Sequence, residues 1–533
     1  MSKKQKAAKK YRAYDPAATV ELAGDLRGYL PSDHLVFLLS DLVDELDLGA
    51  IVGVYEQGDG RGQPPYHPVL LTKLLVYAYC QGVTSSRQIM RKTYEDIAFR
   101  VLCVDQHPDF RTISDFRERH LAAFQSIFTQ TVRLAQQMGQ VRLEHVAQDG
   151  SKVLATASKH KAMSYERMEQ TEERLGQEIA ALLAQAQQED AADDARPGAE
   201  HSGEADPATV AGEVAFREAR RARIRAAKAA LEARAAAEAA AQEPVPDNQR
   251  GQVQLLVTSP DSTPAAEAQT PPPASLPSAA PAEDTATPTV LPAPTAQYSF
   301  TDPDSRIMPS SQGFVQAYNA QAAVDSHAQI IVACDVCQET TDTAQLRPLF
   351  DQVRQTTGAW PEQGSADSGY WSEPNVEALA AHGIDVYLPP PRPRRGAGGT
   401  RPAAQSSPAK AQMQAKLTTP TGKRRYSRRK ETAEPVFGQM KEGRGLRRFR
   451  TRGLAKVRGE WALWCATHNL GKLARVLRGQ HPSATLAVSF SALVPLWTRL
   501  QHAVARPLWC LSTALGGSRR PPGLWASFSQ TGS

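Results

Sequence analysis

The stretch that organises this chain runs from Tyr426 to Trp461 and reads YSRRKETAEPVFGQMKEGRGLRRFRTRGLAKVRGEW. Arg and Lys dominate it, and so basic a surface suits a polyanion such as DNA. Glu434 lies among these cations, and a metal ion would let such a carboxylate sit close to phosphate. Proline is best tolerated in the first turn of a helix, so Pro435 predicts a helix that begins near Thr432, with this residue as its N-cap. A solvated cationic helix with an internal salt bridge is the alternative interpretation.

Size and charge narrow the class of protein. The chain has 533 residues and a formal net charge of +6, so it is longer than one ordinary domain. The positive charge gathers in residues 1–12 and 392–458, which indicates a nucleic acid more than a membrane as partner. No apolar run reaches the roughly 18 residues of a membrane span, and the basic start lacks the apolar segment of a signal peptide.

The cysteines indicate a reducing compartment, because six of them are scattered along a long chain. We therefore expect a cytoplasmic, nucleoid-associated protein. Cys334 and Cys337 form a Cys-x-x-Cys pair, but they lie in a segment that reads as a strand. Residues three apart on a strand face opposite sides, so we do not expect a zinc or redox site there.

Residues 13–140 carry apolar residues at helical spacing and predict an all-helical domain. The expected helices cover 35–48 and 68–80, two short segments starting at Ser85 and Glu95, and a longer one that begins at a capping-box-like Thr112 and ends at Gly139. Short helices joined by tight turns permit a helix-turn-helix DNA reader, and they equally permit a plain helical bundle. The pattern leaves both open.

The pattern then changes to that of a strand over residues 141–150, which ends in Asp149-Gly150. An acid at a strand end is well placed to hold a metal, because the strand fixes its direction. A simple turn is the alternative, since Asp-Gly is a common turn signal. Residues 165–242 predict a helical hairpin, and the Pro-, Ala-, Thr- and Ser-rich residues 243–297 predict a disordered linker.

Residues 298–480 predict a mixed sheet flanked by helices. Strands at 314–325 and 329–336 form a hairpin, and Asp342 starts a helix. A short strand near Asp367, a helix from Ser372 to Gly383, a strand at 384–388, a basic loop at 389–422 and the basic helix follow. The predicted fold class is α+β multidomain: a helical N-terminal domain at 13–140, an RNase H-like core at 141–164 and 298–480 that the hairpin and the linker interrupt, and an irregular tail at 481–533 without an assigned role.

Several segments resemble the DDE transposases of bacterial insertion sequences whose last acid lies in a Tyr-x2-Arg-x3-Glu-x6-Lys signature. The landmarks are Gly62-Gln-Pro-Pro-Tyr-His-Pro68, Gly82-Val-Thr-Ser-Ser-Arg87, Tyr318-Asn-Ala-Gln321 and Ala366-Asp-Ser-Gly-Tyr370. The resemblance implies that Asp149, Asp367 and Glu434 are the three catalytic and metal-binding acids.

The signature itself departs from the family pattern at one point. Tyr426, Arg429 and Lys441 match its other positions, but four residues separate Arg429 from Glu434, and Lys430 occupies the expected position. Either cation could fill the arginine position of the signature, or Tyr426 is out of register with it. Glu431 is a rival third acid, but it lacks a lysine seven residues later.

The resemblance implies a mechanism in which the three acids hold two Mg²⁺ ions, about 3.5–4 Å apart, with Mn²⁺ as a substitute. A water and later a DNA 3′-hydroxyl then attack phosphodiesters, so the element's ends are cut and joined to target DNA. The expected partners are double-stranded DNA, as transposon ends and target, and further copies of the chain. The expected DNA-binding residues are Tyr426, Arg429, Lys430, Lys441, Arg444, Arg447, Arg448, Arg450 and Arg452. An RNase H-like nuclease or resolvase without strand transfer, and a non-catalytic DNA-binding relative, are the alternatives.

Overall fold

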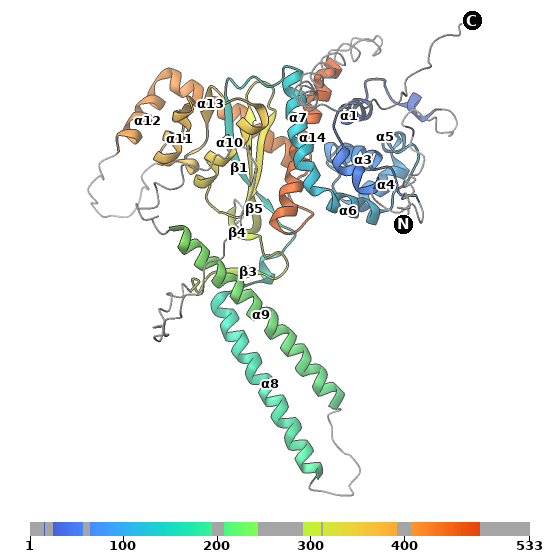
Figure 1. Cartoon of the computed structure of the whole chain (residues 1–533), viewed down its shortest axis with the longest axis vertical. Coiled ribbons are helices and arrows are strands. Elements are labelled where there is room, and N and C mark those ends of the chain that lie inside the picture. The colour runs from blue at the N-terminus through green and yellow to red at the C-terminus, as the bar shows by residue number, and fades with distance from the viewer. Residues whose placement is uncertain are drawn as a thin grey trace, which may run out of the picture.

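A computed structural model describes residues 15, 25–56, 64–194, 207–242, 291–310, 313–391 and 407–479. These residues form an α+β fold in which a helical N-terminal region packs beside a mixed sheet, and a long helical hairpin projects from the body (Figure 1). The predicted tails at 1–12 and 481–533, and most of the predicted linker at 243–297, lie outside the described residues. None of the described helices combines the length and apolar character needed to cross a bilayer.

The N-terminal region consists of short helices, each with a local start signal. Helix α3 begins at Pro68, the first-turn position that proline favours, and Ser85 precedes α4. The expected helix from Thr112 to Gly139 is wrong in detail, because Asp109 caps α6 and the chain breaks at His120. The buried His120 lies 3.3 Å from the Tyr55 hydroxyl. The helices are η1 (Leu26–Tyr29), α1 (Leu35–Asp44), α2 (Gly49–Glu56), α3 (Pro68–Cys80), α4 (Ser86–Glu95), α5 (Ile97–Leu102), α6 (Phe110–Arg119) and α7 (Leu121–Gln137).

The main sheet has six strands in the order β4-β5-β1-β7-β8, with β6 also paired to β5. Strand β1 lies at its centre, antiparallel to β5 and parallel to β7. The predicted hairpin is observed as β5 and β6, which are buried along most of their length. The strands are β1 (Val146–Leu154), β4 (Arg306–Ser310), β5 (Gly313–Asp325), β6 (Ile331–Cys337), β7 (Gln363–Ser365) and β8 (Asp385–Tyr387).

Strand β1 begins and ends later in the chain than the predicted strand at 141–150, so Asp149 lies within the strand rather than at its end. The Asp-Gly pair does not turn the chain, because Gly150 to Leu154 continue to pair with β5. Gly150 also has a packing reason to lack a side chain: a Cβ there would lie 2.9 Å from the Tyr370 hydroxyl and 3.0 Å from Asp342 Oδ1.

The helices of the core correct two further predictions. The expected basic loop at 389–422 contains α12, which Ser407 caps and Pro408 opens, and also the start of α13. Helix α13 begins at Pro420, well before Thr432, whose hydroxyl donates to the Arg428 carbonyl in mid-helix. The core helices are η4 (Thr343–Gln345), α10 (Leu346–Thr357), η5 (Ser368–Tyr370), α11 (Glu373–Ala381), α12 (Pro408–Thr418), α13 (Pro420–Gly438), η6 (Gln439–Gly443) and α14 (Leu454–Gly479).

Pro435 is tolerated inside α13 because a distant side chain replaces the hydrogen bond that it cannot donate. In a regular helix its N–H would bind the Glu431 carbonyl. Gln329, in the turn between β5 and β6, donates its side-chain amide to that carbonyl at 2.8 Å. The helix therefore continues through the proline, which a reading of local sequence cannot foresee.

Helix α14 joins the helical region to the sheet. Its Trp461 and Trp464 are buried in one continuous apolar core that includes α7, β1 and β5. Asn469 acts like a neighbouring strand, because its side-chain amide accepts from Ile331 N–H and donates to the Ile331 carbonyl, each at 2.9 Å. The site elements are thus anchored on a single packed body.

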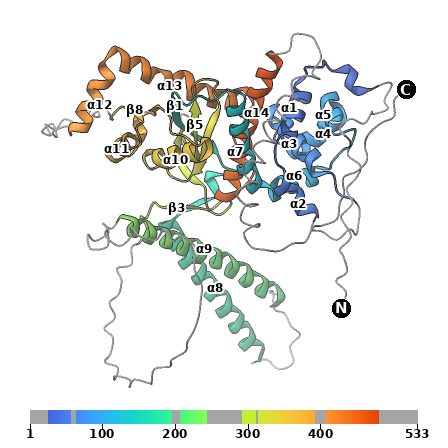
Figure 2. The same cartoon turned by 45° about the horizontal axis from the view of Figure 1, so that its top comes forward.

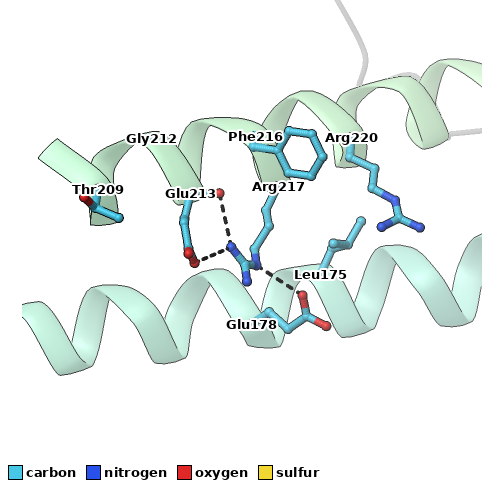
Figure 3. Close-up of a pocket in the computed structure, with 8 residues that line it drawn as sticks. All are labelled: Leu175, Glu178, Thr209, Gly212, Glu213, Phe216, Arg217 and Arg220. Atoms are coloured by element: carbon cyan, nitrogen blue, oxygen red, sulfur yellow. Dashed lines mark hydrogen bonds and ion pairs between the residues drawn. The ribbon is translucent and has the colours of Figure 1, made fainter. Parts of the chain in front are cut away.

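The projecting hairpin, here called the arm, consists of α8 (Tyr165–Asp194) and α9 (Pro207–Gln242) (Figures 1 and 2). It rises from the short pair β2 (Ala162–Ser164) and β3 (Gln297–Ser299), near η2 (Lys159–Lys161). A small apolar cluster that includes Met168 and Leu231 joins the helices near the body. Further out, Arg217 contacts Glu178 and Glu213 beside a cavity of about 480 Å³ (Figure 3).

Candidate active site

Asp149 and Asp367 reach the same part of the sheet because their strands are parallel neighbours. Ala147 pairs with Ser365, and each acid lies two residues further along its own chain. The chain leaves β7 at this point, and the Asp367 carboxylate caps the following turn by accepting the Gly369 N–H at 2.8 Å. Asp149 accepts the N–H of Gly150 at 2.9 Å. The sheet therefore fixes the backbone of both acids.

Glu434 joins them from α13, which packs across β1. The link is Arg429, whose Nη2 lies 3.0 Å from Glu434 Oε1 and whose Nη1 lies 3.7 Å from Asp149 Oδ2. Only 11% of the Arg429 side chain is exposed. One guanidinium thus stands between two of the three predicted acids.

Burial of the site raises the pKa of Asp149 from 3.8 to about 6. Arg429 and the Gly150 N–H oppose this rise, while the charges of Asp367 and Glu434 add to it. Mutual repulsion of this kind requires that the three carboxylates share one neighbourhood.

The donor set fits a divalent cation, because carboxylate oxygens are the ligands that Mg²⁺ prefers. A cation already stands there, since Arg429 bridges Asp149 and Glu434. Within the described ranges, no three His, Cys, Asp or Glu side chains are grouped closely enough to hold an ion. Asp149 and Glu434 therefore flank a guanidinium in this arrangement, and the described residues do not form a closed metal cage.

The other signature residues also lie along β1. The Tyr426 ring lies 5.9 Å from the Arg429 guanidinium. Lys441 Nζ donates to the Lys152 carbonyl at 2.9 Å and to the Ser151 hydroxyl, and burial lowers its pKa. Lys430, the alternative to Arg429, is exposed and has no place between the acids. Glu431, the rival acid, lines a separate cavity with Arg428 and Lys472.

Two family models match the chain. A transposase domain of the DUF772 type matches residues 24–119, and a transposase DDE domain matches residues 397–474. Both matches support an insertion-sequence DDE transposase. The second match contains Arg429, Glu434 and Lys441, whereas Asp149 and Asp367 lie outside both matched ranges. No curated protein and no solved structure matches this chain.

The basic stretch after α13 makes contacts within the chain. Arg448 donates to the Ala155 carbonyl at 2.9 Å, Arg452 to the Thr156 carbonyl at 3.1 Å, and Arg450 to the Thr84 hydroxyl at 3.0 Å. Arg447 pairs with Glu442, and Arg444 is half-buried beside Gly471 of α14. These cations tie the stretch to the body; their contact with DNA stays a prediction.

Asp342 is a site residue that the sequence reading missed, because it was assigned only as a helix start. Its Oδ1 accepts the side-chain amides of Asn319 at 2.6 Å and Gln321 at 2.8 Å, and it lies 3.6 Å from Lys152 Nζ. Gln321 in turn accepts the Tyr370 hydroxyl. This cluster packs directly against Gly150. The available signal was two polar residues, 319 and 321, on one face of an otherwise apolar strand.

Proposed function

We propose that this transposase cuts DNA at the ends of its insertion sequence and joins the freed ends to target DNA, using Asp149, Asp367 and Glu434. The observation that carries the proposal is the Arg429 guanidinium between Asp149 and Glu434, together with the register that places Asp367 on the strand next to Asp149. Carboxylates from a strand, a strand end and a helix that share one cationic centre are suited to holding Mg²⁺ or Mn²⁺. When bound, such ions polarise a phosphodiester and activate the attacking hydroxyl.

The chain's own residues would position the substrate. Asp149 and Asp367 are fixed by the sheet, whereas Glu434 lies on an exposed turn of α13 and is accessible to DNA. An arginine that no longer neutralises the acids is free to contact a phosphate through two parallel hydrogen bonds. Lys441, held at Ser151, adds a point charge on the neighbouring part of β1.

Binding of double-stranded DNA by the exposed cations would make the affinity depend strongly on salt. Because an element has two ends, we propose that the transposase works as a homo-oligomer on DNA.

The test uses duplexes that carry the DNA flanking the coding sequence. Asp149→Asn, Asp367→Asn and Glu434→Gln should each reduce Mg²⁺-dependent nicking by about 10²-fold or more, the range for losing a preorganised electrostatic partner. Asp351→Asn, on the exposed part of α10, is the matched control and should nick normally. Full nicking by any of the three variants would remove that acid from the proposed set.

A second assay separates strand transfer from simple cleavage. A duplex with a pre-cut 3′-end and an unrelated target duplex are mixed with the protein and Mg²⁺. Joined product is expected with the wild type and with Asp351→Asn. Nicking without joining would favour a nuclease or resolvase instead.

A further inference from the structure

A second polar cavity, of about 390 Å³, lies between the β5–β6 turn, α13 and α14. It is separate from the carboxylates but borders the same helix, because Arg428 directly precedes Arg429. Its lining residues are Ser326, His327, Ala328, Gln329, Arg428, Glu431, Thr432 and Lys472.

The two cations of this cavity bind neutral partners. Arg428 Nη2 donates to the Ser326 hydroxyl at 3.2 Å, and Lys472 Nζ donates to the Gln329 side-chain oxygen at 2.7 Å. Neither has a carboxylate partner within ion-pair distance in the part of the chain that the structure describes, although the exposed Glu431 also lines the cavity. Burial lowers the pKa of Lys472, and the charges of Arg475 and Arg444 lower it further. The local charge is therefore positive and suited to an anion.

Gln329 shapes one wall and holds a strained backbone. Its φ is +58°, a left-handed conformation that costs free energy for a residue with a side chain. Contacts from α13 and α14 hold it there: its carbonyl lies 2.9 Å from His468 Nε2, its side-chain amide donates to the Glu431 carbonyl at 2.8 Å, and its side-chain oxygen accepts from Lys472. Strain that surrounding contacts over-determine is typical of binding sites.

We propose that this cavity binds one phosphate group of the DNA backbone, an inference that rests on the proposed action on DNA. Arginine, lysine and hydroxyl groups are the usual contacts to phosphate oxygens. Arg428 and Glu434 are separated by about 9 Å along the helix axis, at about 1.5 Å per residue. Phosphates of one strand follow at about 3.4 Å along a duplex, so a strand that runs along α13 would place two or three nucleotides between the cavity and the carboxylates. Its role is to set the register of the strand at the carboxylates.

The experiment measures the affinity of the full chain for a flanking-DNA duplex without divalent metal, over a series of KCl concentrations. The double variant Arg428→Gln with Lys472→Gln should lower the slope of log affinity against log salt by about 0.9, the value for one lost phosphate contact. Arg428→Lys with Lys472→Arg keeps both charges and should keep the slope. Arg174→Gln with Arg347→Gln removes two exposed charges elsewhere and is the matched control. Equal slopes in the wild type and all three variants would overturn the proposal.

A melting experiment distinguishes a DNA phosphate from a free anion and controls for folding. Inorganic phosphate should raise the melting temperature of the wild type relative to KCl of equal ionic strength, and should not do so for the glutamine variant. Phosphate stabilisation with an unchanged DNA slope would make the cavity a free-anion site and overturn the DNA assignment. Neither readout depends on metal or cleavage, so failure of the proposed catalysis remains distinguishable.

Discussion

Arg217 on the arm and Arg429 in the core each stand between two carboxylates, yet their surroundings differ. Arg217 lies 3.3 Å from Glu178 and 2.9 Å from Glu213, and its side chain is 27% exposed between acids that are 43% and 51% exposed. Arg429 lies 3.0 Å from Glu434 and 3.7 Å from Asp149, whose side chain is only 17% exposed. Both arginines bridge two acids, but only the second is itself buried together with one of its acids, Asp149, while Glu434 is 47% exposed.

The difference in exposure separates an ordinary surface ion pair, that of Arg217, from a candidate functional ion pair, that of Arg429. Arg217 also donates to the Glu213 carbonyl, and solvent completes its shell. In the core, the Arg429 Nε has no hydrogen-bond partner among the described residues, and the pKa of Asp149 is raised to about 6. A buried, incompletely satisfied pair of this kind indicates a site that awaits a further ligand.

The largest expected effect comes from removing the core arginine. Arg429→Ala should reduce Mg²⁺-dependent nicking by about 10²–10³-fold, because it removes a preorganised cation from the carboxylates. Arg217→Ala, the matched change on the arm, should leave nicking unchanged. Nicking rates on the same duplex test both, with DNA affinity measured in parallel. Equal rates for the two variants would break the comparison.

A smaller effect concerns stability and pH. The folded chain holds the Asp149 proton more tightly than the unfolded chain, since the pKa rises from 3.8 to about 6. The sign follows from linkage: this stability is present below about pH 4 and is lost as the pH rises through about 6. Asp149→Asn, which stays neutral, should therefore exceed the wild type in unfolding free energy above pH 6 by up to about 3 kcal/mol.

Urea unfolding across this pH range measures the difference, which should vanish near pH 4. Glu178→Gln on the exposed arm controls for the loss of one carboxylate. If Asp149→Asn were less stable than the wild type at neutral pH, burial would not be the main influence on the pKa of Asp149.

The smallest expected effect is on the arm. Arg217→Ala should change the unfolding free energy by about 0.5 kcal/mol, because exposed ion pairs contribute little and salt screens them. Melting curves at low and high salt should show the difference shrinking as salt rises. A large, salt-independent loss would place Arg217 in the same class as Arg429.

Local sequence patterns were sufficient to predict elements whose structure depends on residues close to one another in the sequence. Alternation predicted the β5–β6 hairpin, and the Ser372 and Gly383 signals bracketed α11. The identities of Asp149, Asp367 and Glu434 came from motif resemblance, and the structure brings them near one guanidinium, while their catalytic role stays a prediction.

Prediction failed where the deciding partner is distant. Pro435 predicts a helix start because no residue close to it in the sequence indicates another donor for the Glu431 carbonyl. That donor is Gln329, which lies 102 residues from Glu431. Asp342 read as a cap because its partners lie on β5, and the pairing of that strand with β1 is set by the whole sheet.

The arm is inserted in the chain between strands β1 and β5 of the main sheet, and this order delays the pairing of the two strands during synthesis. Strand β1 has its antiparallel partner in β5, and Gln148 lies 173 residues before Gln321 in the chain. At about 5–20 residues per second, a ribosome needs roughly 9 to 35 s to deliver that partner. Throughout this interval the strand that carries Asp149 is an open edge, the kind that recruits other chains. Slow elongation or crowding of nascent chains should therefore lower the yield of native protein through aggregation before the sheet closes.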